Sequence, residues 1–243
     1  MRITNRLILV ASMMLLSTFL RAQSAVDPSG HWTGAIHVPA YNGASAREIG
    51  IDVDIAKADG GGLEATFGQS AQNIKGLPLG RVSLDGRTIS FELKANGGGL
   101  FKGTVADPQS IAGELLTAEG GYAIPFNLAR TGDAQIQAPP KSAAIGKELE
   151  GTWNGTVEVE GKKERLVLTL ANQPDGTAAG TVLDLDGSNV EIPVAMTQNA
   201  ANVTIEVAAV AASFTGVLNG NALTGTWNQG PLSLSLSFSR GAK

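Results

Sequence analysis

The sequence GHWTG at residues 30–34 recurs as GTWNG at residues 151–155, and this repetition decides the fold. Each copy closes on an alternating stretch that ends in arginine, residues 122–130 in the first copy and residues 232–240 in the second. Each copy is about a hundred residues long, well above the roughly 20–50 residues of a solenoid repeat. The sequence therefore predicts two similar domains in tandem.

The N-terminal stretch, residues 1–24, has the pattern of a secretory signal peptide. Arg2 and Arg6 supply the charged start, and residues 7–20 form an apolar stretch shorter than the roughly 20 residues of a membrane-spanning helix. Small residues at 22–24 suit cleavage by a signal peptidase. We therefore expect a protein secreted to the periplasm or outside the cell, with an uncleaved anchor as the alternative.

Composition excludes several classes of partner. Without Arg2, Arg6 and Arg21 of the leader, the chain carries 15 basic and 22 acidic side chains, a net charge of −7. Nucleic acids and anionic membranes bind clustered Lys and Arg, so this balance argues against both as partners. The absence of cysteine excludes disulfides and attachment of a lipid to a terminal cysteine.

Each copy contains eight short segments in which apolar residues occupy alternate positions, separated by turns rich in Gly, Asn and Asp. This is the pattern of successive β-hairpins. In the first copy the segments are residues 32–38, 49–55, 63–67, 77–82, 89–93, 101–105, 111–115 and 122–128. In the second copy they are residues 153–159, 166–170, 178–182, 190–194, 203–207, 214–218, 223–227 and 232–238.

An open eight-stranded meander would leave two unpaired edges, which favour aggregation. Closure into a barrel removes those edges, and glycines at inward positions such as Gly103 and Gly225 suit the close backbone approach this needs. We therefore predict an all-β protein of two tandem eight-stranded antiparallel up-and-down barrels, with a two-sheet sandwich as the alternative. The expected domains are residues 25–131 and 148–243, joined by a linker over residues 132–147 that contains Pro139 and Pro140.

The Gly-X-Trp opening with an arginine on the last strand resembles the signature of the calycins, which include lipocalins and fatty-acid-binding proteins. The resemblance implies that Trp32 pairs with Arg130 and Trp153 with Arg240, each arginine lying over an indole at one end of its barrel. These four residues are the predicted structural signature.

A second resemblance covers all of the second copy and most of the first. The GTWNG string, residues 192–194 (IPV) and residues 223–230 (LTGTWNQG) are similar to the accessory β-domain that commonly precedes the catalytic domain of secreted bacterial α/β hydrolases. No hydrolase domain follows in this sequence, so the resemblance implies an accessory or binding role with a secreted hydrolase or another envelope protein as partner.

Candidate catalytic and metal-binding residues have simpler interpretations. Ser70 lacks the final glycine and the helix of a nucleophile elbow. His31 and His37 lie six residues apart on one strand, too far to share a metal ion. Residues 48, 52 and 54 form an acidic outer face, and residues 184–187 (DLDG) suit a turn better than a calcium loop. We expect no catalytic residue, no metal and no cofactor.

Inward aromatic residues leave one alternative open. They serve as ordinary core or, in part, line a pocket for a small apolar ligand. The candidate ligand-binding residues are Phe91, Phe101, Tyr122, Phe214 and Trp227, and the small side chains at residues 207–212 favour a cavity in the second copy. The sequence therefore predicts a non-catalytic accessory module for protein interaction, with a carrier of small apolar ligands as the alternative.

Overall fold

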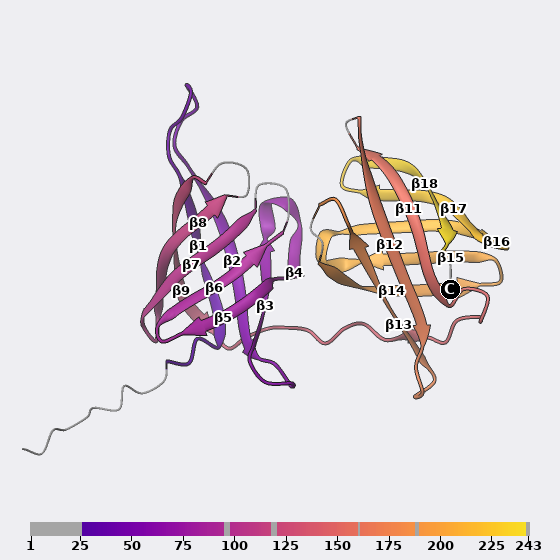
Figure 1. Ribbon diagram of the computed structural model, residues 1–243, viewed down its shortest axis with the longest axis horizontal. Coiled ribbons are helices and arrows are strands. Elements are labelled where there is room, and N and C mark those ends of the chain that lie inside the picture. Colours follow the sequence, from indigo (N-terminus) through magenta and orange to yellow (C-terminus); the bar gives the residue numbers. More distant parts are fainter. Residues whose placement is uncertain (1–25, 95–97, 118–120, 160, 188–189, 242–243) are drawn as a thin grey trace, which may run out of the picture.

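The structure is a computed structural model that describes residues 26–94, 98–117, 121–159, 161–187 and 190–241. Two antiparallel β-barrels follow one another along the chain (Figure 1), and this confirms the predicted fold class. Within the described residues, the only helices are two single 3-10 turns. None of the helices in the described part is long and apolar enough to cross a membrane.

The first barrel is a nine-stranded sheet in the order β4-β3-β2-β1-β9-β8-β7-β6-β5. The two end strands of this sheet, β4 and β5, follow one another in the chain and meet beside β3. There the amide of Leu79, which lies between them, donates to the Ala65 carbonyl at 2.9 Å. The strands are β1 (Gly30–Val38), β2 (Arg47–Lys57), β3 (Leu63–Gln69), β4 (Ile74–Pro78), β5 (Gly80–Asp85), β6 (Thr88–Leu93), β7 (Gly99–Asp107), β8 (Ser110–Thr117) and β9 (Ala123–Gly132).

The second barrel closes with eight strands, because β13 pairs with β14 as well as with β12. A short ninth strand, β10 (Ser142–Ala143), pairs with the rest of the β13 edge. The eight are β11 (Gly151–Val159), β12 (Lys162–Asn172), β13 (Thr177–Asp184), β14 (Glu191–Asn199), β15 (Asn202–Val207), β16 (Ala212–Asn219), β17 (Ala222–Gln229) and β18 (Leu232–Arg240).

The expectation of eight strands in the first barrel is wrong at one place. Residues 77–82 do not form a single strand, because the chain divides them between β4 and β5 at Leu79. Arg81 has a φ of 50°, and the pairing of β5 with β6 shifts register between Gly80 and Ser83. A left-handed residue is incompatible with continuous extended backbone, so one strand ends and another begins.

Two segments contain local structure beyond the predicted strands. The predicted linker contains the strand β10, which the sequence pattern did not indicate. Within residues 207–212, Val207 ends β15 and Ala212 begins β16, while Ala208–Val210 form the 3-10 turn η2 and Ala211 ends it with a φ of 48°. The alanines therefore make a tight connection between β15 and β16.

Each barrel interior is filled by side chains from alternate positions of its strands. Trp32 and Trp153 have no exposed surface, and each indole Nε1 donates at 2.9 Å to the carbonyl four residues earlier, of Pro28 and Leu149 respectively. This equivalence shows that the repeated sequence builds the same local structure twice.

Paired glycines let neighbouring strands approach closely in both barrels. Gly103 lies opposite Gly113, and Gly216 lies opposite Gly225. A Cβ atom on Gly113 or on Gly225 would lie 2.1 Å from a backbone carbonyl oxygen and 2.5 Å from the Cα of the opposite glycine. Only glycine fits these positions without a shift of the backbone.

Candidate functional site

The strands β11 and β18 of the second barrel part from one another along most of their length. Their pairing in the described residues covers three register positions, from Trp153 opposite Arg240 to Gly155 opposite Phe238. β11 nevertheless stays paired with β12 as far as Val159, and β18 stays paired with β17 from Leu232 onward. The barrel wall therefore has an open seam between residues 156–159 and residues 232–237.

In the first barrel, the corresponding first and last strands, β1 and β9, stay paired over more of their length. There β1 and β9 stay paired as far as Ile36 opposite Phe126. A Cβ atom on Gly34 would lie 1.9 Å from the Asn127 carbonyl oxygen, so the two backbones are in close contact. At the equivalent Gly155, a Cβ atom would instead lie 2.7 Å from the ring of Phe238. An aromatic side chain thus occupies the place where the first barrel has backbone contact.

The open seam presents backbone hydrogen-bonding groups. The Gly241 amide donates to the Thr152 carbonyl at 2.7 Å. Since backbone groups alternate in direction along a strand, even-numbered residues of β11 and odd-numbered residues of β18 direct theirs toward the seam. Beyond the paired positions, these are Thr156 and Glu158 on β11 and Ser233, Ser235 and Ser237 on β18.

A groove of about 800 Å³ on the second barrel reaches from the paired part of β11 and β18 to the start of this seam, at Thr156 and residues 235–237. Its floor includes Gly155, Leu166 and Leu236, which point inward, while hydroxyl and amide side chains of β11, β17 and β18 form much of its walls. The polar wall residues are Asn154, Thr156, Thr224, Ser235, Ser237 and Ser239. Arg165 is the one charged residue among the described residues that line the groove.

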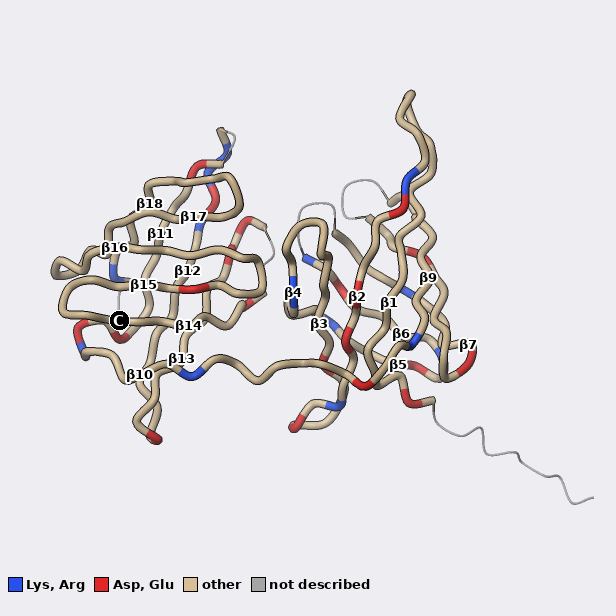
Figure 2. The backbone as a smooth tube through the Cα atoms, turned by 180° about the vertical axis from the view of Figure 1, so that it is seen from behind, with Lys and Arg blue, Asp and Glu red and all other residues tan. Residues whose placement is uncertain are grey.

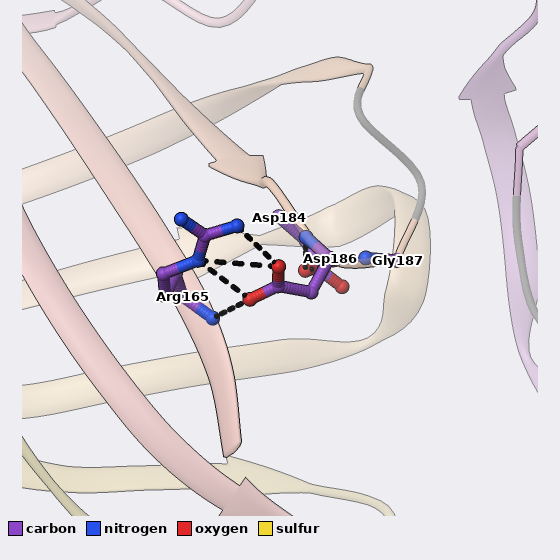
Figure 3. Close-up of polar contacts among 4 residues, drawn as sticks. All are labelled: Arg165, Asp184, Asp186 and Gly187. Carbon is purple, nitrogen blue, oxygen red and sulfur yellow. Dashed lines mark hydrogen bonds and ion pairs between the residues drawn. The ribbon is translucent and has the colours of Figure 1, made fainter. Parts of the chain in front are cut away.

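Arg165 is engaged by Asp186 at the groove wall (Figure 3). Its Nη2 lies 2.5 Å from Asp186 Oδ1, its Nε lies 3.0 Å from Oδ2, and its backbone amide donates to Oδ2 at 2.8 Å. The hydrogen bonds from Arg165 lower the pKa of Asp186 to about 2. The guanidinium is therefore paired within the chain, and the described residues that line the groove offer an anion no other cation.

The DLDG sequence at residues 184–187 forms a turn that caps itself (Figure 3). Asp184 Oδ1 accepts hydrogen bonds from the amides of Asp186 and Gly187 at 3.1 and 2.9 Å. Burial, with Asp184 and Asp186 nearby, raises the pKa of the Glu164 carboxyl. Both aspartates already serve a turn or an ion pair, in agreement with the interpretation of this sequence as a plain turn.

Three of the predicted ligand-binding residues lie in packed core. Phe91 and Phe101 stack with their ring centroids 5.0 Å apart, and Phe126 packs edge-on against Phe101 at 5.2 Å. In the second barrel, Phe214 packs edge-on against Phe238 at 5.4 Å. The side chains of Phe91, Phe101 and Phe214 have no exposed surface. Each of these rings packs against another ring of its own barrel, and none of them is among the residues that line the groove.

The other two predicted ligand-binding residues lie nearer the surface. The expectation that Tyr122 faces the interior is wrong: 61% of it is exposed, next to the exposed Tyr41, with ring centroids 6.1 Å apart. Tyr122 precedes β9 rather than belonging to it, so the strand's alternation does not direct its side chain inward. Trp227 is half-buried and packs against the core from β17.

The structural signature residues lie at the ends of their barrels. Arg240 covers the Trp153 ring, with its guanidinium carbon 4.3 Å from the ring centroid. Arg130 lies directly opposite Trp32 in the pairing of β1 with β9, and a Cβ atom on Gly30 would lie 2.5 Å from its Nε. In each barrel the arginine of the last strand thus sits beside the tryptophan of the first.

The histidines and the outer acidic residues pair with one another. His31 Nδ1 lies 2.8 Å from Asp54 Oδ1, and His37 Nδ1 lies 3.1 Å from Glu48 Oε1. Asp52 comes from the same strand as these carboxylates. No group of three or more His, Asp or Glu residues suited to a metal ion occurs in the described part of the chain. Ser70 begins the 3-10 turn η1 (Ser70–Gln72), a connection between β3 and β4.

Sequence reasoning did not find the groove. The outward serines of β18 were visible as an alternating set, but the seam depends on how the first and last strands of the barrel separate. Pairing between strands about 80 residues apart leaves no local pattern. Charged residues of both signs are scattered along the strands and turns of both barrels (Figure 2), and among the described residues that line the groove only Arg165 is charged.

Comparison with known proteins gives no family. Neither a family model nor a curated protein matches the chain. Among solved structures, one match is a "putative outer membrane protein" from Bacteroides fragilis NCTC 9343, with 12% identity, a TM-score of 0.29, and coverage of 89% of this chain and 98% of that chain. Another is a DUF3598-family protein of unknown function from Nostoc punctiforme PCC 73102, with 13% identity, a TM-score of 0.26, and coverage of 88% and 96%.

Proposed function

We propose that this protein is a secreted, non-catalytic accessory module that binds a partner protein in the groove between β11 and β18. The secretory pattern of residues 1–24 supports action in the periplasm or outside the cell. The resemblance of the GTWNG copy to the accessory domain of secreted hydrolases favours a secreted hydrolase or another envelope protein as the partner.

The observation that carries this proposal is the contrast between the barrel interiors and the groove. The aromatic rings proposed for a carrier site pack against one another inside, whereas the groove of about 800 Å³ opens on the outer surface. Small apolar ligands bind in enclosed apolar pockets, whereas an open groove beside an exposed strand edge suits an extended polypeptide. The groove therefore favours protein interaction over the carrier role.

Site-specific photo-crosslinking tests the proposal in the organism that produces the protein. A photo-crosslinking amino acid replaces Ser237 in the groove wall and, as a matched control, the exposed Glu206 on β15 outside the groove. We expect a discrete protein adduct from position 237 and none from position 206.

The outcomes separate the two roles. Equal adducts from both positions, or no adduct from position 237, would contradict binding in the groove. Native mass spectrometry of the purified protein adds a second readout. A small molecule of a few hundred daltons, retained in stoichiometric amount, would support the carrier role instead.

A further inference from the structure

We propose that the groove binds its partner by strand addition: an extended segment of the partner pairs with the open edge of β18, antiparallel to it. This inference rests on the proposed function and specifies the chemistry of the bound segment. Strand addition obtains affinity from main-chain hydrogen bonds and specificity from pockets for alternate side chains.

The same barrel already uses this solution at another opening. β13 pairs with β14 from Gly180 to Leu183, and the strand β10 takes the place of β14 along the rest of that edge, opposite Ala178 and Thr177. The Ser142 hydroxyl accepts a hydrogen bond from the Met196 amide on β14 at 2.8 Å. A short extended segment of small residues, Ser142 and Ala143, thus fits between two parted strands of this barrel.

The residues that follow β10 show how such a segment is held. The Asn172 side chain accepts from the Ile145 amide at 2.9 Å and donates to the Ile145 carbonyl at 2.8 Å. The Gln198 side chain accepts from the Gly146 amide at 2.8 Å. Beyond the Ser142 hydroxyl, the linker is therefore held in part through its backbone.

At the seam between β11 and β18, the edge of β18 is the longer open one. Residues 232–237 of β18 lie beyond its pairing with β11, compared with residues 156–159 of β11. Antiparallel pairing is slightly more stable than parallel pairing for each residue. An added strand therefore pairs best with β18, through the backbone groups of Ser233 and Ser235.

Uncovered apolar side chains lie along this opening. Leu232, at the start of β18, is 44% exposed, and Leu185, in the groove wall, is 38% exposed. Leu234 is half-buried and packs against the core, whereas Leu236 is fully part of the buried core. The β18 side of the barrel thus loses its cover progressively toward the open end of the seam, as expected where a strand is missing.

The register defines the pattern of the bound segment. In an antiparallel pair, residues that lie opposite one another point to the same face of the sheet. Residues opposite Leu234 and Leu236 would face the core and should be small and apolar, while those opposite Ser233 and Ser235 would face outward. The outward residues of the segment are those whose backbone groups bond to β18.

The charge of the groove supports an uncharged segment. Arg165 is the one charged lining residue in the described part of the groove, and Asp186 holds it in a bidentate pair. A phosphate or an acidic tail would gain little there. Recognition through the backbone, with small polar and apolar side chains, matches the groups that the walls present.

Peptide binding tests the proposal with the full chain. The probe is the capped, fluorescein-labelled peptide STVTVTS, which has no charged side chain and whose threonines take the outward positions. One version is N-methylated at two threonines, which removes the N–H groups directed at β18, and a matched version is N-methylated at two valines. We expect the threonine-methylated peptide to bind about tenfold more weakly, since two hydrogen bonds are lost, while the valine-methylated peptide binds like the parent.

A variant of the protein gives an independent test. Ser235 lies opposite Thr226 but directs its N–H toward the seam, so Ser235→Pro removes a donor at the open edge without removing a bond to β17. Ser235→Ala is the control, because it keeps the N–H and removes only the hydroxyl. We expect Ser235→Pro to weaken peptide binding about tenfold and Ser235→Ala, which loses only the hydroxyl, to weaken it far less, with melting curves confirming that both variants fold.

Several outcomes would overturn strand addition. These are equal binding of the two methylated peptides, absence of binding by the parent peptide at millimolar concentration, or a dimer of the chain that buries β18 and excludes the peptide. Cross-links from position 237 together with any of these results would leave the interaction role intact and reject only strand addition. Absence of the cross-links would reject the proposed function itself.

Discussion

Arg240 lies over the ring of Trp153, with its guanidinium carbon 4.3 Å from the ring centroid. The same guanidinium donates to the Glu150 carbonyl at 2.6 Å and to the Glu148 carbonyl. One side chain on the last strand therefore holds the first strand and the turn before it. This contact closes the end of the second barrel at which β11 and β18 remain paired.

Replacement of Arg240 by methionine should destabilise the protein by about 2 kcal/mol, since a cation–π contact and hydrogen bonds from a charged group are lost. Urea unfolding followed by circular dichroism measures the loss. Lys57→Met is the control: the ion pair of Lys57 with Asp27 is exposed, so its loss should cost less than about 1 kcal/mol. Equal effects of the two substitutions would show that Arg240 does not stabilise the end of the second barrel.

Trp153→Ala removes a fully buried indole together with its hydrogen bond to Leu149. We expect the free energy of unfolding of the full chain to fall by about 3–5 kcal/mol, as for other large-to-small changes in a core. An almost unchanged urea midpoint would mean that the tryptophan does not anchor the barrel.

Gly225→Ala tests the close approach of β16 and β17. The new Cβ would lie 2.1 Å from the Thr215 carbonyl oxygen, so the strands must separate, at a cost of about 1–3 kcal/mol. Gly50→Ala on β2 is the matched control, because a Cβ there meets nothing within 4 Å. A thermal midpoint lowered by the second substitution as much as by the first would disprove the packing argument.

The ion pair at the groove wall makes a prediction about pH. Because Arg165 lowers the pKa of Asp186 from 3.8 to about 2, the ionised carboxylate favours the folded state. This contribution is complete above the unfolded pKa and is lost as the pH falls through the folded pKa. We expect NMR titration to place the Asp186 midpoint near 2 and to return it toward 3.8 in Arg165→Gln. A midpoint that does not move in the variant would show that the pair does not form in solution.

The sequence predicted most of the fold because its strands alternate and its turns contain Gly, Asn and Asp. The division of residues 77–82 at Leu79 escaped prediction, because Arg81 is an ordinary strand-compatible residue whose positive φ is imposed by tertiary structure. Tyr122 was assigned to a strand that begins one residue later, so its predicted direction was wrong. In both cases the period-two pattern was extended past the end of an element.

The groove was beyond sequence reasoning for a different reason. Gly34 and Gly155 occupy the same position in the two copies, yet one allows backbone contact and the other covers the ring of Phe238. Which of these occurs depends on packing between the first and last strands of each barrel. The local sequence is similar in the two copies, so the repeat predicted likeness at the place where the barrels differ.

The open seam between β11 and β18 is most directly tested by amide hydrogen exchange in the unbound protein, resolved residue by residue with NMR. Amides of Leu234 and Leu236 face β17 and should be protected, whereas that of Ser235 faces the seam and should exchange far faster. Asn127, which is paired with Ala35 in the first barrel, should be protected. Protection of Ser235 equal to that of its two neighbours would show that the seam is closed and would contradict the groove as a binding site.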